Sequence, residues 1–154
     1  MVRRAQNRDI AGLLRLLSQI GKIHYENRPD VFKENCQKYD EKALLELLKD
    51  ENRPIFVAVD DSNHVLGYCF CYLHIKSHPV MHEQLILHID DFCVDEAHRS
   101  RGIGKILFDT VLDFARQQDV ANIDLNVWAF NEKAIKFYEN LGFNIQHYTM
   151  EMKP

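Results

Sequence analysis

The stretch that decides the fold is LILHIDDFCVDEAHRSRGIGK, residues 85–105. Its apolar first half, Leu85–Val94, predicts a buried strand. A basic turn with two glycines follows, and the residues after it, Ile106, Leu107, Val111 and Phe114, recur at helical spacing. A buried strand that leads through a glycine turn into an amphipathic helix is typical of α/β and α+β domains.

The same analysis of periodicity extends outward from this stretch. It predicts helices at 9–21, 31–39, 41–49 and 131–141, and further strands at 1–6, 55–59, 65–75, 123–127 and 143–152. No repeat or low-complexity linker interrupts the 154 residues, so we expect one domain over 1–154, with helices on both faces of a mixed sheet.

The composition excludes several classes of protein. Lys and Arg total 19 against 23 Asp and Glu, a net charge of -4, which gives no support to nucleic-acid binding. No apolar run reaches the roughly 18 residues of a membrane span, and the first residues lack the apolar core of a signal peptide. We therefore expect a cytoplasmic protein with no membrane partner. The cysteines lack the spacing of zinc or redox sites and are expected to be reduced core residues: Cys36, Cys69, Cys71 and Cys93.

The turn 99–105 carries the chemistry of anion binding. Free N–H groups and the positive end of the helix dipole point outward at a helix start, and glycines let an anion approach the backbone. Arg99, Arg101 and Lys105 add positive charge. The turn lacks the Gly-Lys-Ser/Thr of a P-loop and the third glycine of a dinucleotide-binding loop. The histidines at 74, 78, 82 and 88 show no metal-ligand spacing, and we expect no metal.

Two runs together give a specific family resemblance. The segment 90–104, with its Arg-x-x-Gly-x-Gly, and the segment 131–143, NEKAIKFYENLGF, resemble the GNAT superfamily of acetyl-CoA-dependent N-acetyltransferases in both spacing and order. The resemblance implies a mixed, mostly antiparallel sheet of about six to seven strands. It also implies that acetyl-CoA contacts Phe92, Cys93, Val94, Arg99, Ser100, Arg101, Gly102, Ile103, Gly104, Lys105, Asn131, Lys133 and Tyr138.

Three residues are candidates for catalysis. Tyr138 matches the tyrosine that serves GNAT enzymes as general acid; the alternative is a core aromatic beside Phe137. Asp90 and Asp91 interrupt an apolar strand, where a buried carboxylate is costly without a partner or a task. Strict alternation points them to opposite faces unless a bulge intervenes. Either residue can instead be a structural carboxylate that accepts hydrogen bonds from loop amides.

The local pattern Ile-Asp-Asp-Phe-Cys-Val is similar to the polyamine branch of the family, which implies a link between Asp90 and amine activation. Polyamines would call for carboxylates around the acceptor, and the region 26–41 offers Glu26, Asp30, Glu34, Asp40 and Glu41. His24 stands where that branch carries an acidic residue, and Arg28, Lys33 and Lys38 dilute the charge. We also expect His82, Glu83 and His88 near the acceptor.

The sequence therefore predicts an enzyme that transfers an acetyl group to a primary amine by direct attack in a ternary complex. The acceptor is left open between a small amine or polyamine and a lysine or N-terminal amine of a protein. The alternative is a non-catalytic domain that binds acyl-CoA as a sensor or interaction module. The resemblance further implies a homodimer, with Tyr148 and Met150 of the strand expected at 143–152 available for contact.

Overall fold

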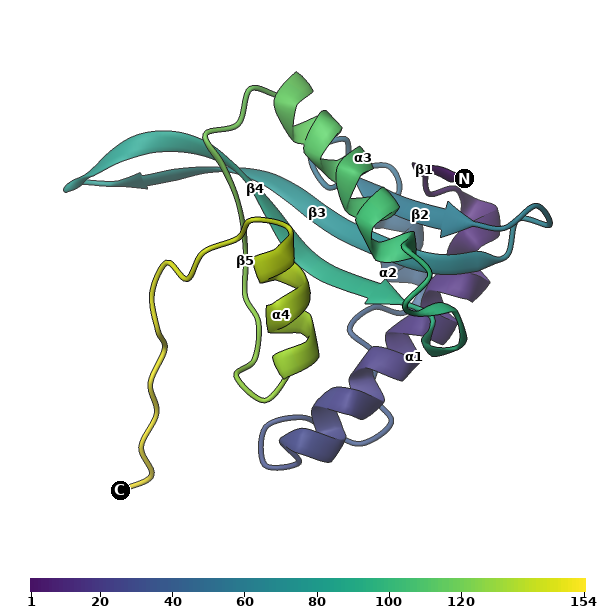
Figure 1. Cartoon of the computed structure of the whole chain (residues 1–154), viewed down its shortest axis with the longest axis horizontal. Coiled ribbons are helices and arrows are strands. Elements are labelled where there is room, and N and C mark those ends of the chain that lie inside the picture. The colour runs from purple at the N-terminus through teal and green to yellow at the C-terminus, as the bar shows by residue number, and fades with distance from the viewer.

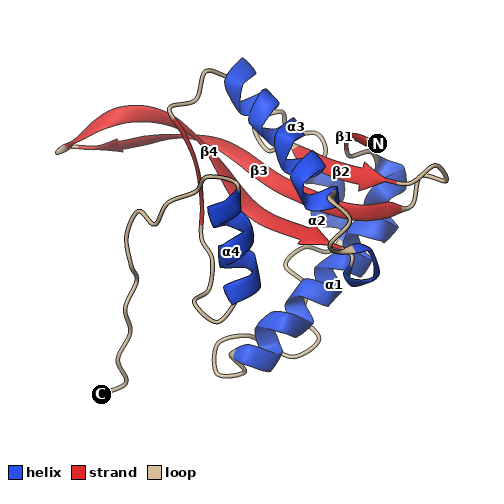
Figure 2. Ribbon diagram, viewed as in Figure 1, coloured by secondary structure: helices blue, strands red, loops and turns tan.

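The computed structural model describes residues 1–154 as a five-stranded sheet with helices packed on both faces (Figure 1, Figure 2). The strands, in their spatial order, are β1 (Val2–Arg4), β2 (Ile55–Val59), β3 (Val65–His78), β4 (Met81–Val94) and β5 (Asn122–Leu125). The helices are α1 (Ile10–Asn27), α2 (Glu41–Leu47), α3 (Ile103–Gln117) and α4 (Glu132–Asn140), with short 3-10 turns at Asn7–Asp9 and Glu96–His98. The expected mixed sheet is confirmed, but the expected six to seven strands are wrong.

The topology follows from how the strands are joined. Strands β1 to β4 pair antiparallel, and β3 and β4 form one long hairpin that turns between His78 and Met81. Helix α3 then crosses the sheet, so β5 returns parallel to β4. This last pairing is short, because it covers only Ile86–Ile89 of β4 and Asn122–Leu125 of β5.

The core lies on both faces of the sheet. Alternate residues of β2 and β3, such as Val57 and Tyr68, pack with α1 and α2, while their neighbours, such as Phe56 and Cys69, pack with α3. Burial on both faces explains why β2 and the first half of β3 read as continuous apolar runs rather than as alternating ones.

Three expectations about local structure are wrong. Residues 31–39 form no helix, and residues 143–152 form no strand. Helix α1 does not end near Gly21 but runs on to Asn27. Gly21 is needed for close packing, since a Cβ there would lie 2.7 Å from the carbonyl oxygen of Cys36. Residues 31–39 are thus held against α1 by backbone packing.

The cysteines divide into two groups. Cys69, Cys71 and Cys93 are free and buried, as expected. Cys36 is exposed, which corrects its assignment to the core. None of the helices is long and apolar enough to cross a membrane.

Candidate active site

A cleft opens where β4 and β5 separate. The two strands part after Ile89 and Leu125, and β4 continues to Val94 with no strand on that edge. The cleft has a volume of about 500 Å³, within the usual range for small-molecule sites. Its walls come from α1, residues 32–38, β4, residues 125–131 and α4. The unpaired edge of β4 thus borders a cavity rather than another strand.

A β-bulge brings both candidate aspartates to this cleft. Phe70 pairs with Asp91 and Cys71 pairs with Ile89, which leaves Asp90 as the extra residue of β4. Residues directly opposite in a sheet share a face, so Asp91 lies with Phe70 on the α1 side. Asp90 bonds to Lys38 and Tyr39, which approach on the same side. The bulge therefore removes the alternation that would have separated the two carboxylates.

The pKa values of the two aspartates shift in opposite directions. The Asp90 carboxylate accepts a hydrogen bond of 2.6 Å from the Tyr39 hydroxyl and pairs with the Lys38 ammonium at 2.8 Å. Burial acts to raise the pKa of Asp90, but these two partners outweigh it and hold that pKa below the usual range. Burial is also the largest influence on the pKa of Asp91. The attraction of Lys38 acts to lower this pKa, but burial and the repulsion from Asp90 raise it to about 6.

Tyr138 reaches the cleft from α4. Its ring makes edge contacts with Phe92 and Phe143, with centroids 6.3 and 5.6 Å apart, and its hydroxyl makes no hydrogen bond to the protein. Burial, followed by the nearby Cys69 and Asp91, raises the pKa of Tyr138 above its usual value. The phenol is therefore protonated at neutral pH and able to donate.

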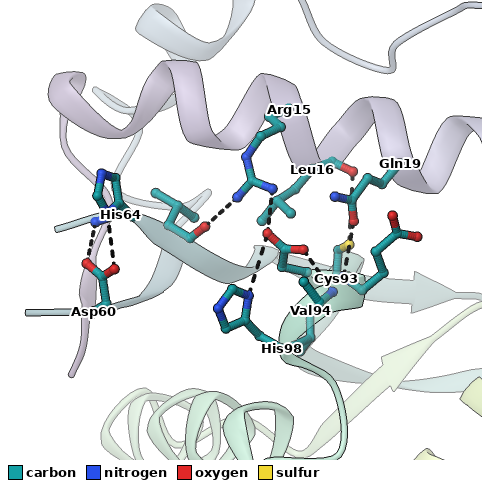
Figure 3. A network of polar contacts seen from close by, with 12 residues as sticks. Arg15, Leu16, Gln19, Asp60, His64, Cys93, Val94 and His98 are labelled. Carbon is teal, nitrogen blue, oxygen red and sulfur yellow. Dashed lines mark hydrogen bonds and ion pairs between the residues drawn. The ribbon is translucent and has the colours of Figure 1, made fainter. Parts of the chain in front are cut away.

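A polar network fixes the chain where it leaves β4 (Figure 3). The Arg15 side chain donates to the buried Asp95 carboxylate and, at 2.8 Å, to the carbonyl oxygen of Val65. Asp95 also accepts from the Ala97 amide at 3.1 Å. The Gln19 side chain accepts from the Glu96 amide at 3.3 Å. Helix α1 thereby positions the turn that precedes α3.

The start of α3 has the features of an anion site. Gly102 precedes the helix in a left-handed conformation, with φ of 78°, and supplies no side-chain cap for the first N–H groups. Arg101 makes no ion pair, whereas Lys105 is paired with Asp109 at 2.8 Å. Gly104 has another reason to be glycine, since a Cβ there would lie 3.1 Å from the Phe137 ring. The small residue lets α3 pack against α4.

The other residues expected at the cofactor take different positions. Phe92 and Asn131 line the cleft, and the Asn131 side chain also caps α4 by accepting from the Ala134 amide at 3.2 Å. Cys93 buries its side chain on the α1 side of the sheet, so only its backbone reaches the open edge. Lys133 is exposed in the first turn of α4 and does not line the cleft.

The outer part of the cleft differs from the expectation for a polyamine site. Of the acidic residues expected there, Glu26, Asp30, Glu34, Asp40 and Glu41, none lines the cleft, and His82 and Glu83 lie at the exposed tip of the β3–β4 hairpin. His88 does line the cleft, and its Nδ1 lies 2.6 Å from the Asp124 carboxylate.

Sequence reasoning placed His24, Lys33 and Lys38 around the acceptor, and all three line the cleft. It missed several other residues that line the cleft: Phe32, Cys36, Gln37 and Trp128. The aromatic residues Phe32 and Trp128, each in a segment outside regular secondary structure, were the only signal for them.

Comparisons with known proteins identify the family of the chain. Residues 18–143 match the acetyltransferase (GNAT) family. A tyramine N-feruloyltransferase of Nicotiana tabacum is 25% identical over 134 residues, which are 84% of this chain and 58% of that protein. A streptothricin acetyltransferase of Streptomyces lavendulae is 30% identical over 95 residues, 62% of this chain and 47% of that protein. The chain thus spans about half the length of the curated relatives it matches.

Solved structures share the whole fold. A crystal structure of the BH1408 protein of Bacillus halodurans superposes with a TM-score of 0.95 at 30% identity, covering 100% of this chain and 99% of that one. The aminoglycoside N-acetyltransferase AAC(6')-Iy, solved with CoA, superposes with a TM-score of 0.74 at 14% identity, covering 100% of this chain and 98% of that one. An N-acetyltransferase that binds CoA therefore shares this fold. The chain belongs to the acetyltransferase (GNAT) family, whose members use acetyl-CoA, so the expected family is confirmed.

Proposed function

We propose that residues 1–154 form an N-acetyltransferase domain that moves the acetyl group of acetyl-CoA to a primary amine in a ternary complex. The observation that carries this proposal is the unpaired edge of β4, with the uncapped start of α3 beyond its end and Asp91 and Tyr138 in the cleft beside it. Backbone groups of Phe92 to Val94 would bind the pantetheine amides as a neighbouring strand does. The N–H groups of residues 99–105, with Arg99 and Arg101, would hold the pyrophosphate.

The side chains in the cleft suit the proton transfers of this reaction. The nitrogen–carbon bond forms as the carbon–sulfur bond breaks. The ammonium loses two protons as it becomes an amide, one before the attack and one after it. The thiolate gains one proton, and the base passes the other to solvent. Asp91, whose pKa is raised to about 6, is ionised at pH 7 and accepts the proton directly or through a water. Tyr138 donates to the sulfur. Asp90 is already paired with Lys38 and Tyr39, and we assign it to positioning those residues.

The class of acceptor is proposed only as a primary amine. The relatives' names refer to tyramine and streptothricin, which supports an amine-bearing small molecule. The local pattern at 89–94 keeps polyamines among the candidates, and a lysine or N-terminal amine of a protein is the third. Three buried free cysteines suit the reducing cytoplasm, where we place the enzyme.

We also propose a homodimer. Strand β5 is the last strand of the sheet, so its outer edge is unpaired. The segment 143–152 exposes large apolar side chains: Ile145, Tyr148, Met150 and Met152. An exposed apolar segment and a free strand edge are complementary surfaces for a second copy.

The decisive experiment incubates the purified protein with acetyl-CoA and a panel of amines. Release of free CoA is followed with a thiol reagent, and the acetylated product is identified by mass spectrometry. Product that forms in step with free CoA supports the proposal. Tight CoA binding without product from any amine would instead identify the non-catalytic acyl-CoA-binding domain.

A further inference from the structure

The outer end of the cleft is built from aromatic rings. His24 of α1 stacks on Phe32, with ring centroids 4.7 Å apart, and Phe32 meets Trp128 edge-on at 5.3 Å. Phe130 stacks behind Trp128 at 6.0 Å. We call these four residues the aromatic wall. Its first three members line the cleft, and Trp128 is 39% exposed although it is the largest of them. A tryptophan supported on one side and left open on another is poised to contact a ligand.

The cationic side chains beside the aromatic wall are Arg28, which is neutralised by two carboxylates, and Lys33 and Lys38 of the cleft. The Arg28 guanidinium lies 5.5 Å from the centre of the Trp128 ring, where Asp30 and Glu151 hold it by hydrogen bonds. Lys33 and Lys38 both line the cleft, and Lys33 makes no ion pair. Burial and Lys38 lower the pKa of His24, so its ring is neutral and continues the apolar surface.

No carboxylate at this end is free to receive a second ammonium. The only acidic side chains that line the cleft are Asp90 and Asp91. Asp90 is bound to Lys38 and Tyr39, and Asp91 is the proposed base. An amine that carries a further positive charge would place it near Lys33, which makes no ion pair. Arg28 already makes a cation–π contact with the Trp128 ring.

We propose that the acceptor is a primary amine on a short chain that carries an aromatic ring, and that it has no second positive charge. The ring would lie against Trp128 and Phe32 while the amine reaches Asp91. This inference rests on the proposed acetyltransferase function and narrows its acceptor. It disfavours polyamines, because their inner and distal ammonium groups would meet Lys33 in the cleft and no free carboxylate.

The acceptor is tested with compounds matched for length. We expect kcat/KM for 2-phenylethylamine to exceed that for 2-cyclohexylethylamine by about 3- to 10-fold, the range that aromatic contacts provide beyond apolar area. We expect it to exceed that for spermidine by about 100-fold or more, since like charges oppose binding. Phe32→Leu should remove most of the preference for phenyl over cyclohexyl. The matched control is Tyr25→Leu, an aromatic change on α1 that does not line the cleft, and it should retain the preference.

A second readout needs no turnover. The chain has one tryptophan, so intrinsic fluorescence excited at the indole reports on Trp128 alone. In the presence of CoA, 2-phenylethylamine should change this fluorescence saturably, and spermidine should not. Turnover of spermidine as fast as that of 2-phenylethylamine would overturn the inference while leaving the acetyltransferase function intact. Failure of every amine to react would overturn the function. Absence of a fluorescence response to 2-phenylethylamine would overturn the inference by itself.

Discussion

At the residue scale, Asp90 and Asp91 should respond to neutralisation with opposite signs. The folded-state pKa of Asp91 is about 6 against 3.8 for the free side chain, so its contribution to stability is full below pH 3.8 and is lost as the pH rises through 6. Asp91→Asn removes the buried charge. We expect it to raise the free energy of unfolding at pH 7.5 by about 1–3 kcal/mol, and hardly at all at pH 3.5. Urea unfolding at the two pH values measures the difference.

Asp90→Asn is the matched control for this prediction. The pKa of Asp90 is lowered, so its stabilising pairing is present above the usual carboxylate pKa and is lost as the pH falls. This variant should therefore lose about 1–3 kcal/mol at pH 7.5, because it removes the negative charge that pairs with Lys38 and strengthens the hydrogen bond from Tyr39. Equal effects of the two variants would contradict the opposite pKa shifts of the two aspartates. Turnover should fall sharply in Asp91→Asn, and the wild-type kcat/KM should rise with pH through about 6.

A substitution at Tyr138 can distinguish a catalytic role of its hydroxyl from a packing role of its ring. Tyr138→Phe keeps the ring contacts with Phe92 and Phe143 and removes a hydroxyl that bonds to nothing in the protein. We expect kcat to fall by about 10²–10⁴-fold, the range for a lost general acid. Cofactor affinity, from calorimetry, and the melting temperature should barely change. Near-normal turnover would return Tyr138 to the role of a packing residue.

At the element scale, Gly21 sets how closely residues 28–39 approach α1. Gly21→Ala places a Cβ 2.7 Å from the Cys36 carbonyl oxygen, and backbone cannot move aside as a side chain can. The overlap should cost about 1–3 kcal/mol and outweigh the gain of about 1 kcal/mol from replacing a helical glycine. We expect a lower melting temperature and a higher KM for the amine, with unchanged CoA affinity. Ser18→Ala, on the exposed face of α1, controls for helix propensity. A Gly21→Ala protein more stable than wild type would show that the packing is loose.

Elements whose apolar residues face a core were predictable from the sequence. Helix α3 shows its buried residues at helical spacing, and strand β2 reads as a short continuous apolar run. The Gly-x-Gly turn marks the passage from β4 to α3. The segment 31–39 shows the limit of that reasoning. Its apolar residues suggested a helix face, but Phe32 packs on His24 and Tyr39 on Phe70, contacts that only the folded chain creates.

Part of the candidate site could be predicted from the sequence, and part could not. Asp91, Tyr138 and the turn 99–105 could be proposed because each stands in a short run with a recognisable spacing. The bulge that turns Asp90 and Asp91 to one face depends on the register between β3 and β4, which no single strand encodes. The aromatic wall joins residues about 100 positions apart, His24 and Trp128, and therefore has no local signature.

At the scale of the whole molecule, the proposed dimer places segment 143–152 against a second copy. Ile145, Tyr148, Met150 and Met152 are each between 61% and 90% exposed in the isolated chain, and an exposed run of this kind marks an interaction surface. We expect light scattering at micromolar concentration to give twice the mass of one chain. The double variant Tyr148→Ser, Met150→Ser should give the single-chain mass with unchanged circular dichroism, because neither side chain belongs to the core. Lys136→Ser, an exposed change on α4, should leave the dimer intact. A wild-type protein that scatters as a single chain would remove the dimer from the proposal, while the cleft, which is built within one chain, would keep its function.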